Sequence, residues 1–171
     1  MRRAFVSLVG LSLAASLVIA CSPAAQTGGS PQSIESPPST GSPQAVAATQ
    51  TKDVFVYKSP TCSCCHEWES YMTTNGYTVH SVPKEDMTAI KEQMGVPDAV
   101  WSCHTAVIGK YVIEGHVPIE AIQDLLASGS DIDGIALAGM PSGSPGMPGV
   151  KAGRFAIAAF DDGETSSFGT Y

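Results

Sequence analysis

Three cysteines and a histidine fall within five residues of this chain, in the segment Cys62-Ser63-Cys64-Cys65-His66. The segment follows a strand-like apolar run at 53–57, and a further pair, Cys103-His104, comes about forty residues later. Thiolates act as nucleophiles, redox couples or metal ligands. Core packing does not account for so many sulfur and nitrogen donors in one loop. The fold must therefore place this loop where its chemistry is used.

The apolar pattern predicts one small α/β domain over residues 52–171. The run at 53–57 is typical of a central strand. A helix is expected to begin in the cysteine cluster, with Thr61 or Ser63 as its N-cap, and to end at Asn75-Gly76. The next expected elements are a strand at 77–82, a helix around 87–94, a hairpin of 105–108 with 111–114, and a helix that starts at Pro118.

This β-α-β-α-β-β-α order is that of the thioredoxin fold. In that fold a redox motif opens the first helix, where this chain has Cys62-x-x-Cys65. A cis-proline-threonine pair faces that motif from just before the third strand, where this chain has Cys103-His104-Thr105. The two clusters are therefore expected to meet. After the last helix, a Gly/Pro-rich loop presents Met140 and Met147, and the segments 155–160 and 165–171 predict a C-terminal β-hairpin.

The N-terminus predicts export. Arg2 and Arg3 precede an apolar run that ends in Val18-Ile19-Ala20-Cys21, which resembles the cleavage box of bacterial lipoproteins. Residues 1–20 are then a signal peptide, and Cys21 becomes the lipidated first residue. Residues 21–51 are rich in Ser, Pro and Gly and are expected to form a disordered tether. An ordinary signal peptide or an uncleaved anchor remains the alternative.

The charge balance excludes one class of partner. The full chain carries 9 basic and 16 acidic residues, a net charge of −7. Cleavage after residue 20 removes Arg2 and Arg3, which leaves 7 basic against 16 acidic residues and a net charge of −9. Such a chain repels phosphates, so no nucleic-acid partner is expected.

Four chemistries are open to the cysteines. Cys62 and Cys65 match a thiol-disulfide oxidoreductase motif, although Cys64 and Cys103 would compete for exchange. In an oxidising compartment the four cysteines could instead form two structural disulfides. Zinc sites use similar donors, but their ligands usually come as two separated pairs.

Cuprous copper fits the donor types better than zinc does. Cu(I) is soft and favours thiolate, thioether and imidazole ligands. A Cys-x-Cys-Cys loop at a helix N-terminus offers sulfurs that bridge several ions, and the positive helix end offsets part of the thiolate charge. His66 and His104 add nitrogen donors, and Met140 and Met147 add thioethers if their loop folds over the site.

Four spaced motifs stand out, and they are Val56-Tyr57-Lys58-Ser59-Pro60-Thr61-Cys62-x-Cys64-Cys65, Ser102-Cys103-His104-Thr105-Ala106, Val112-Ile113-Glu114-Gly115-His116-Val117-Pro118 and Gly139-Met140-Pro141-x-Gly143-Ser144-Pro145-Gly146-Met147. Together they resemble one family, the small exported copper-resistance proteins of CopG type, from about residue 53 to residue 171. The resemblance implies a thioredoxin-like fold with a cysteine-built Cu(I) site that holds several ions, in the periplasm or at the cell surface. This chain departs from many relatives at Ser63 and His66, where they have Gly.

The sequence therefore predicts a lipid-anchored Cu(I)-binding protein of the cell envelope, used for copper sequestration, transfer or resistance rather than as an enzyme. Its expected partners are copper ions, the membrane through Cys21, and other envelope proteins that handle copper. His116 is expected beside the site but not on the metal. A thiol-disulfide oxidoreductase using Cys62 and Cys65 is the alternative. The expected metal ligands are Cys62, Cys64, Cys65, Cys103, His104, His66, Met140 and Met147.

Overall fold

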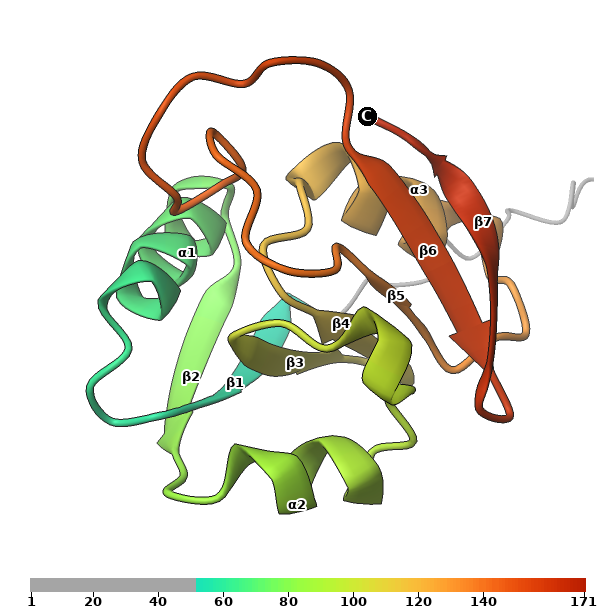
Figure 1. The fold of residues 1–171 in the computed structure, drawn as a ribbon, viewed down its shortest axis with the longest axis horizontal. Coiled ribbons are helices and arrows are strands. Elements are labelled where there is room, and N and C mark those ends of the chain that lie inside the picture. The colour runs from blue at the N-terminus through green and yellow to red at the C-terminus, as the bar shows by residue number, and fades with distance from the viewer. Residues whose placement is uncertain (1–51) are drawn as a thin grey trace, which may run out of the picture. The chain divides into compact units, whose positions relative to one another are not determined.

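The computed structural model describes residues 52–171 (Figure 1). The predicted signal peptide (1–20), the tether (21–51) and the lipid acceptor Cys21 lie outside these residues. Within the described part of the chain, no helix is long and apolar enough to cross a membrane.

A seven-stranded sheet carries the fold, in the strand order β2-β1-β3-β4-β5-β6-β7. β1 pairs in parallel with β2 and antiparallel with β3, and β4 pairs in parallel with β5. The elements are β1 (Asp53–Lys58), α1 (Ser63–Thr74), β2 (Thr78–Pro83), α2 (Met87–Gln93), the 3₁₀ turn η1 (Asp98–Val100), β3 (His104–Ile108), β4 (Tyr111–Glu114), α3 (Ile119–Ser128), β5 (Gly134–Ala136), β6 (Ala156–Asp161) and β7 (Glu164–Thr170).

The predicted order of elements is confirmed from β1 to α3, and so is the C-terminal hairpin of β6 and β7. The prediction missed η1 and β5. β5 is only three residues long and is buried throughout, with β4 on one side and β6 on the other. It therefore joins the C-terminal hairpin to the first four strands and makes one continuous sheet.

Side chains alternate across the sheet and form two cores. On one face, α1 and α3 cover the strands with Trp68, Met72, Ile122 and Leu125, which are all fully buried. The other face holds a smaller cluster that includes Val100 from η1 and Phe160 from β6. The long segment between β5 and β6 leaves the sheet and returns past α1 (Figure 1).

The start of α1 corrects one prediction. Cys62 occupies the N-cap position, and no side chain makes a capping hydrogen bond there, so neither Thr61 nor Ser63 is the cap. The Cys62 N–H instead donates to the Ser59 carbonyl at 3.1 Å, which closes a turn just before the helix. All three clustered cysteines therefore lie at the positive end of the helix dipole.

Candidate metal centre

The first cysteine cluster sits at the N-terminus of α1. Cys62 and Cys65 are joined by a disulfide, with their Cα atoms 5.4 Å apart. Cys64 is a free thiol, and its Sγ lies 3.6 Å from the Sγ of Cys62. Cys65 is fully buried, whereas Cys62 and Cys64 are half-buried. The cluster therefore opens toward solvent through two of its three sulfurs.

Cys103, directly before β3, lies against this cluster. Its Sγ is 3.9 Å from the Sγ of Cys64, and its carbonyl oxygen is 3.9 Å from the Sγ of Cys65. The sulfur atoms of Cys62, Cys64, Cys65 and Cys103 all lie within 4.8 Å of one another. Because β3 pairs with β1, the segment before β3 and the segment after β1 reach the same end of the sheet. The two motifs meet where the predicted topology requires.

Two histidines extend the cluster on the far side of Cys103. His116 Nε2 lies 2.8 Å from the Cys103 Sγ, and His104 Nδ1 lies 3.2 Å from it. Both imidazoles are fully buried. Cys103, His104 and His116 form a second group whose donor atoms lie within 4.8 Å of one another. Cys103 thus belongs to both groups.

The hydrogen bonds of His116 fix its tautomer. Its Nδ1 lies 2.7 Å from the carbonyl oxygen of Pro145, which can only accept a hydrogen bond. The proton is therefore on Nδ1, and the Nε2 lone pair points at the Cys103 sulfur. This arrangement, in which a carbonyl orients a histidine, is typical of metal-binding imidazoles. His104 differs from His116, because its Nε2 is buried and has no hydrogen bond among the described protein atoms.

Burial sets the protonation of Cys103, His104 and His116. Burial raises the pKa of the Cys103 thiol to about 12, and the neighbouring Cys64 adds to the rise. Burial also lowers the pKa of both imidazoles, and for His104 the charges of His116, Lys91 and Lys58 add to the effect. Both histidines are therefore neutral near pH 7, the form that binds metals. Cys103 must lose its proton when a metal binds.

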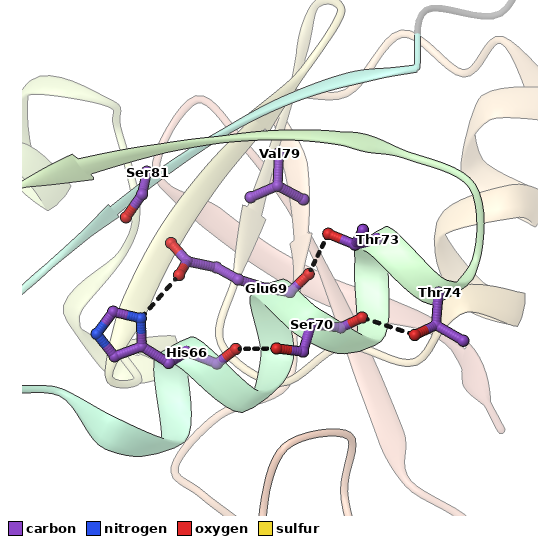
Figure 2. A pocket seen from close by; sticks show the side chains of 7 residues that line it. All are labelled: His66, Glu69, Ser70, Thr73, Thr74, Val79 and Ser81. Atoms are coloured by element: carbon purple, nitrogen blue, oxygen red, sulfur yellow. Dashed lines mark hydrogen bonds and ion pairs between the residues drawn. The ribbon is translucent and has the colours of Figure 1, made fainter.

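His66 lies away from both donor groups. Its ring nitrogens are 2.8 and 3.0 Å from the Nζ of Lys58, and its Nδ1 is 3.2 Å from Glu69 Oε2. Lys58 and Glu69 also form an ion pair of 3.2 Å. His66 and Glu69 line a groove of about 480 Å³ between α1 and β2, with Val79 and Ser81 on the strand side (Figure 2).

The methionine loop reaches the centre through its backbone. A Cβ at Gly146 would lie 2.6 Å from the backbone nitrogen of Trp68 and 2.9 Å from the carbonyl oxygen of Cys64, so this loop packs directly on α1. Met147 is half-buried and lines a depression of about 340 Å³ beside Glu67, whereas Met140 is 52% exposed. Their role as thioether ligands remains a prediction.

His116 was predicted beside the site but not on the metal, and in the structure its Nε2 points at the Cys103 sulfur. The signal in the sequence was its motif, Gly115-His116-Val117-Pro118, directly after β4. Pairing of β4 with β3 brings that motif to the level of Cys103-His104, because Thr105 is opposite Glu114. The predicted hairpin of β3 and β4 therefore contained the signal that places His116 next to Cys103.

Known proteins resemble this chain in sequence and in fold. A family profile described as "Protein of unknown function, DUF411" matches residues 100–147. A solved structure titled "Copper resistance protein copG- Form 2" is 36% identical, with a TM-score of 0.64, and the match covers 70% of this chain and 97% of that chain. A second solved structure, titled "Copper resistance protein copG- Form 1", is 35% identical, with a TM-score of 0.64, and the match covers 71% of this chain and 98% of that chain. No curated protein sequence matches. This chain therefore belongs to the CopG-type copper resistance family.

Proposed function

We propose that this protein binds Cu(I) in the cell envelope and holds more than one ion per chain, for copper sequestration or transfer. The observation that carries the proposal is the shared sulfur of Cys103. It lies in a four-sulfur group with Cys62, Cys64 and Cys65, and also in a group with two imidazoles. A sulfur that belongs to two adjacent donor groups can bridge two ions.

The donor chemistry fits copper in the reduced state. Thiolates and neutral imidazoles are the ligands that Cu(I) prefers. His104 presents its Nδ1 to the Cys103 sulfur at 3.2 Å, and burial keeps its imidazole neutral, which is the form that binds a metal ion. The likeness to solved structures whose titles name a copper resistance protein supports the same metal.

The disulfide sets a condition for loading. Cys62 and Cys65 can bind copper only as thiolates, so their S–S bond must first accept two electrons and two protons. A dithiol reductant supplies both and leaves as its own disulfide. Each thiol then releases its proton as copper binds. Copper loading therefore depends on the redox state of the protein.

One experiment tests this function. The protein is reduced and handled without oxygen, titrated with Cu(I), and analysed for bound copper and free thiols. We expect more than one tightly bound copper per chain and four free thiols before loading. One copper or none per chain would contradict the proposal. Preference for Zn²⁺ over Cu(I) in competition would identify zinc, not copper, as the metal of this site.

A second function has one observation in its favour. The Cys62–Cys65 disulfide at the start of a helix is the oxidised form of an exchange motif. Rapid reduction of a test disulfide by copper-free protein, retained in Cys64→Ser, would identify an oxidoreductase. The Cys64 sulfur, 3.6 Å from Cys62, argues for copper because an exchange pair has no need of it.

The cellular setting is also a proposal. We infer that Cys21 carries a lipid, that residues 21–51 tether the domain to a membrane, and that other copper-handling envelope proteins supply or receive the metal. Support comes from the sequence Val18-Ile19-Ala20-Cys21 and from the composition of the segment after it.

A further inference from the structure

A buried ion pair lies under the segment that carries Cys103. Lys91 of α2 is 4% exposed and Glu114 of β4 is fully buried, and the Lys91 Nζ lies 2.5 Å from Glu114 Oε1. Lys91 also donates to the hydroxyl of Thr105 at 3.1 Å. All three side chains lie on the sheet face opposite the core formed by α1 and α3.

Stability alone does not account for this pair. Removing two charges from water costs several kcal/mol per ion, and apolar replacements of similar volume are often as stable or more stable. Val112, which lies on the same face of β4 as Glu114, packs against the apolar cluster of Val100 and Phe160, so this face of the strand packs without charge. The groups that Lys91 and Glu114 hold in place therefore matter more than the stability of the ion pair itself.

The Glu114 carboxylate holds both flanks of the Cys103-His104 dipeptide. Its Oε1 accepts a hydrogen bond from the Ser102 N–H at 2.6 Å, and its Oε2 accepts one from the Thr105 hydroxyl at 2.7 Å. Ser102 directly precedes Cys103, and Thr105 directly follows His104. One rigid carboxylate thus fixes the backbone on either side of two proposed copper ligands.

Lys91 and the backbone complete the arrangement. The ammonium holds the carboxylate in one orientation, because it contacts both Glu114 and Thr105. The N–H of Gly115 donates to the carbonyl of His104 at 2.9 Å, which ties the end of β4 to the same dipeptide. His116, the other imidazole of the centre, follows one residue later. The positions of Cys103, His104 and His116 therefore all depend on the segment around Glu114.

We propose that Glu114, held by Lys91, is a positioning residue for the copper centre, and that it keeps Cys103 and His104 at their distances from Cys64 and His116. The proposal rests on the proposed function. Lys91 and Glu114 then affect copper binding through the ligands that they position, although neither side chain is itself in a donor group. Partners that orient metal ligands typically change metal affinity by about 10- to 100-fold when they are replaced.

Two double variants separate orientation from charge. Lys91→Met with Glu114→Gln removes both charges and keeps a carbonyl oxygen for the Ser102 N–H. Lys91→Met with Glu114→Met removes both charges and the acceptor. Cu(I) affinity is measured by competition with a colorimetric Cu(I) chelator, at a temperature well below the unfolding midpoint of each variant.

We expect the K91M/E114M variant to bind Cu(I) about 10- to 100-fold more weakly than the K91M/E114Q variant. In the reduced, metal-free proteins, alkylation of Cys103 should be faster in K91M/E114M, while alkylation of Cys64 stays unchanged. Equal Cu(I) affinity and equal Cys103 alkylation in the two folded variants would overturn the proposal. Asp131→Asn, which breaks the exposed ion pair of Lys110 and Asp131, is the control and should match wild type.

A third variant covers the case in which K91M/E114M does not fold. Thr105→Val keeps both charges but removes the hydroxyl that donates to Glu114 Oε2 and accepts from Lys91. Weaker Cu(I) binding by folded Thr105→Val supports the proposal, and wild-type affinity refutes it. Wild-type protein that binds no Cu(I) refutes the proposed function instead, and the Cys103 alkylation rates then still decide whether Glu114 orients that thiol.

Discussion

Replacing Gly146 by alanine tests how the methionine loop covers the metal centre. Gly146 has φ +80°, and an added Cβ would lie 2.6 Å from the backbone nitrogen of Trp68 and 2.9 Å from the carbonyl oxygen of Cys64. Both contacts are shorter than real Cβ atoms tolerate, and both partners are helix backbone, which cannot give way. The loop must therefore lift from α1 or the helix must shift.

A second glycine provides the control. Gly163, in the turn between β6 and β7, also has φ +80°, but a Cβ there meets nothing within 4 Å. Gly163→Ala therefore costs only the left-handed backbone conformation, about 1–2 kcal/mol. Gly146→Ala costs the same amount plus the overpacking, about 1–3 kcal/mol. The difference between the two variants isolates the close approach of loop and helix.

Thermal unfolding and copper binding measure that difference. At about 4 °C per kcal/mol for a domain of this size, Gly163→Ala should lower the midpoint by about 4–8 °C, and Gly146→Ala by about 8–20 °C if the loop stays seated. If the loop lifts instead, the fall in midpoint is smaller, but His116 loses the Pro145 carbonyl that orients it. Cu(I) affinity should then fall by about 10- to 100-fold in Gly146→Ala alone. Equal midpoints and equal copper affinities in the two variants would refute this packing.

Three further predictions rest on the metal centre, and a fourth tests the proposed lipid anchor. Cys64→Ser should reduce the amount of bound copper, measured by metal analysis, about as much as Cys62→Ser does, and full loading would exclude Cys64 as a ligand. As Cu(I) is added, Cys103 should become protected from alkylation in step with the cluster; peptide mapping that finds it free while the cluster is protected would separate the two. Metal-free protein should lose stability as pH falls below about 6.5, because the unfolded chain protonates His104 more readily than the folded one, and His104→Gln should flatten that dependence. Cys21→Ser should release the protein from membranes, and normal membrane retention would exclude lipidation.

Local signals predicted most of the fold. Asn75-Gly76 ends α1 where glycine adopts φ +84°, and Gly109 adopts φ +61° between β3 and β4. These turns depend on residues within a few positions of one another, so the sequence contains the whole signal. β5 has no such signal, since its three residues, Gly134–Ala136, become a strand only because β4 and β6 offer backbone partners on both sides.

The same distinction explains what was missed at the metal centre. The meeting of Cys103 with the first cluster follows from strand order, and strand order was predictable. The buried role of Lys91 was not, because a lysine among polar residues on a short helix is typical of a solvated face. Only the packing of α2 against β3 and β4 shows that its partner, Glu114, lies within 2.5 Å.

His66 shows the limit of proximity in sequence. It directly follows Cys65, and that adjacency made it an expected ligand. On a helix, however, consecutive side chains point about 100° apart, and residues three positions apart share a face. His66 accordingly lies beside Glu69, over the end of β1 at Lys58, in the groove against β2 (Figure 2). Strand pairing brings His116, fifty residues later, to 2.8 Å from the Cys103 sulfur, whereas His66 belongs to neither donor group.

Charge supports the proposal of several Cu(I) ions rather than one. In the reduced protein, four thiolates would carry four negative charges, at cysteines that are buried or half-buried. Neither nearby ammonium offsets them fully, because Lys58 is already paired with Glu69 and Lys91 with Glu114. A single Cu(I) would leave three negative charges in a site where desolvation penalises charge. The centre then either keeps protons on its sulfurs, beginning with Cys103, whose burial raises its pKa, or takes up further monovalent cations. Because Cys103 joins both donor groups, each added Cu(I) favours loss of its proton, and loss of that proton favours the next ion.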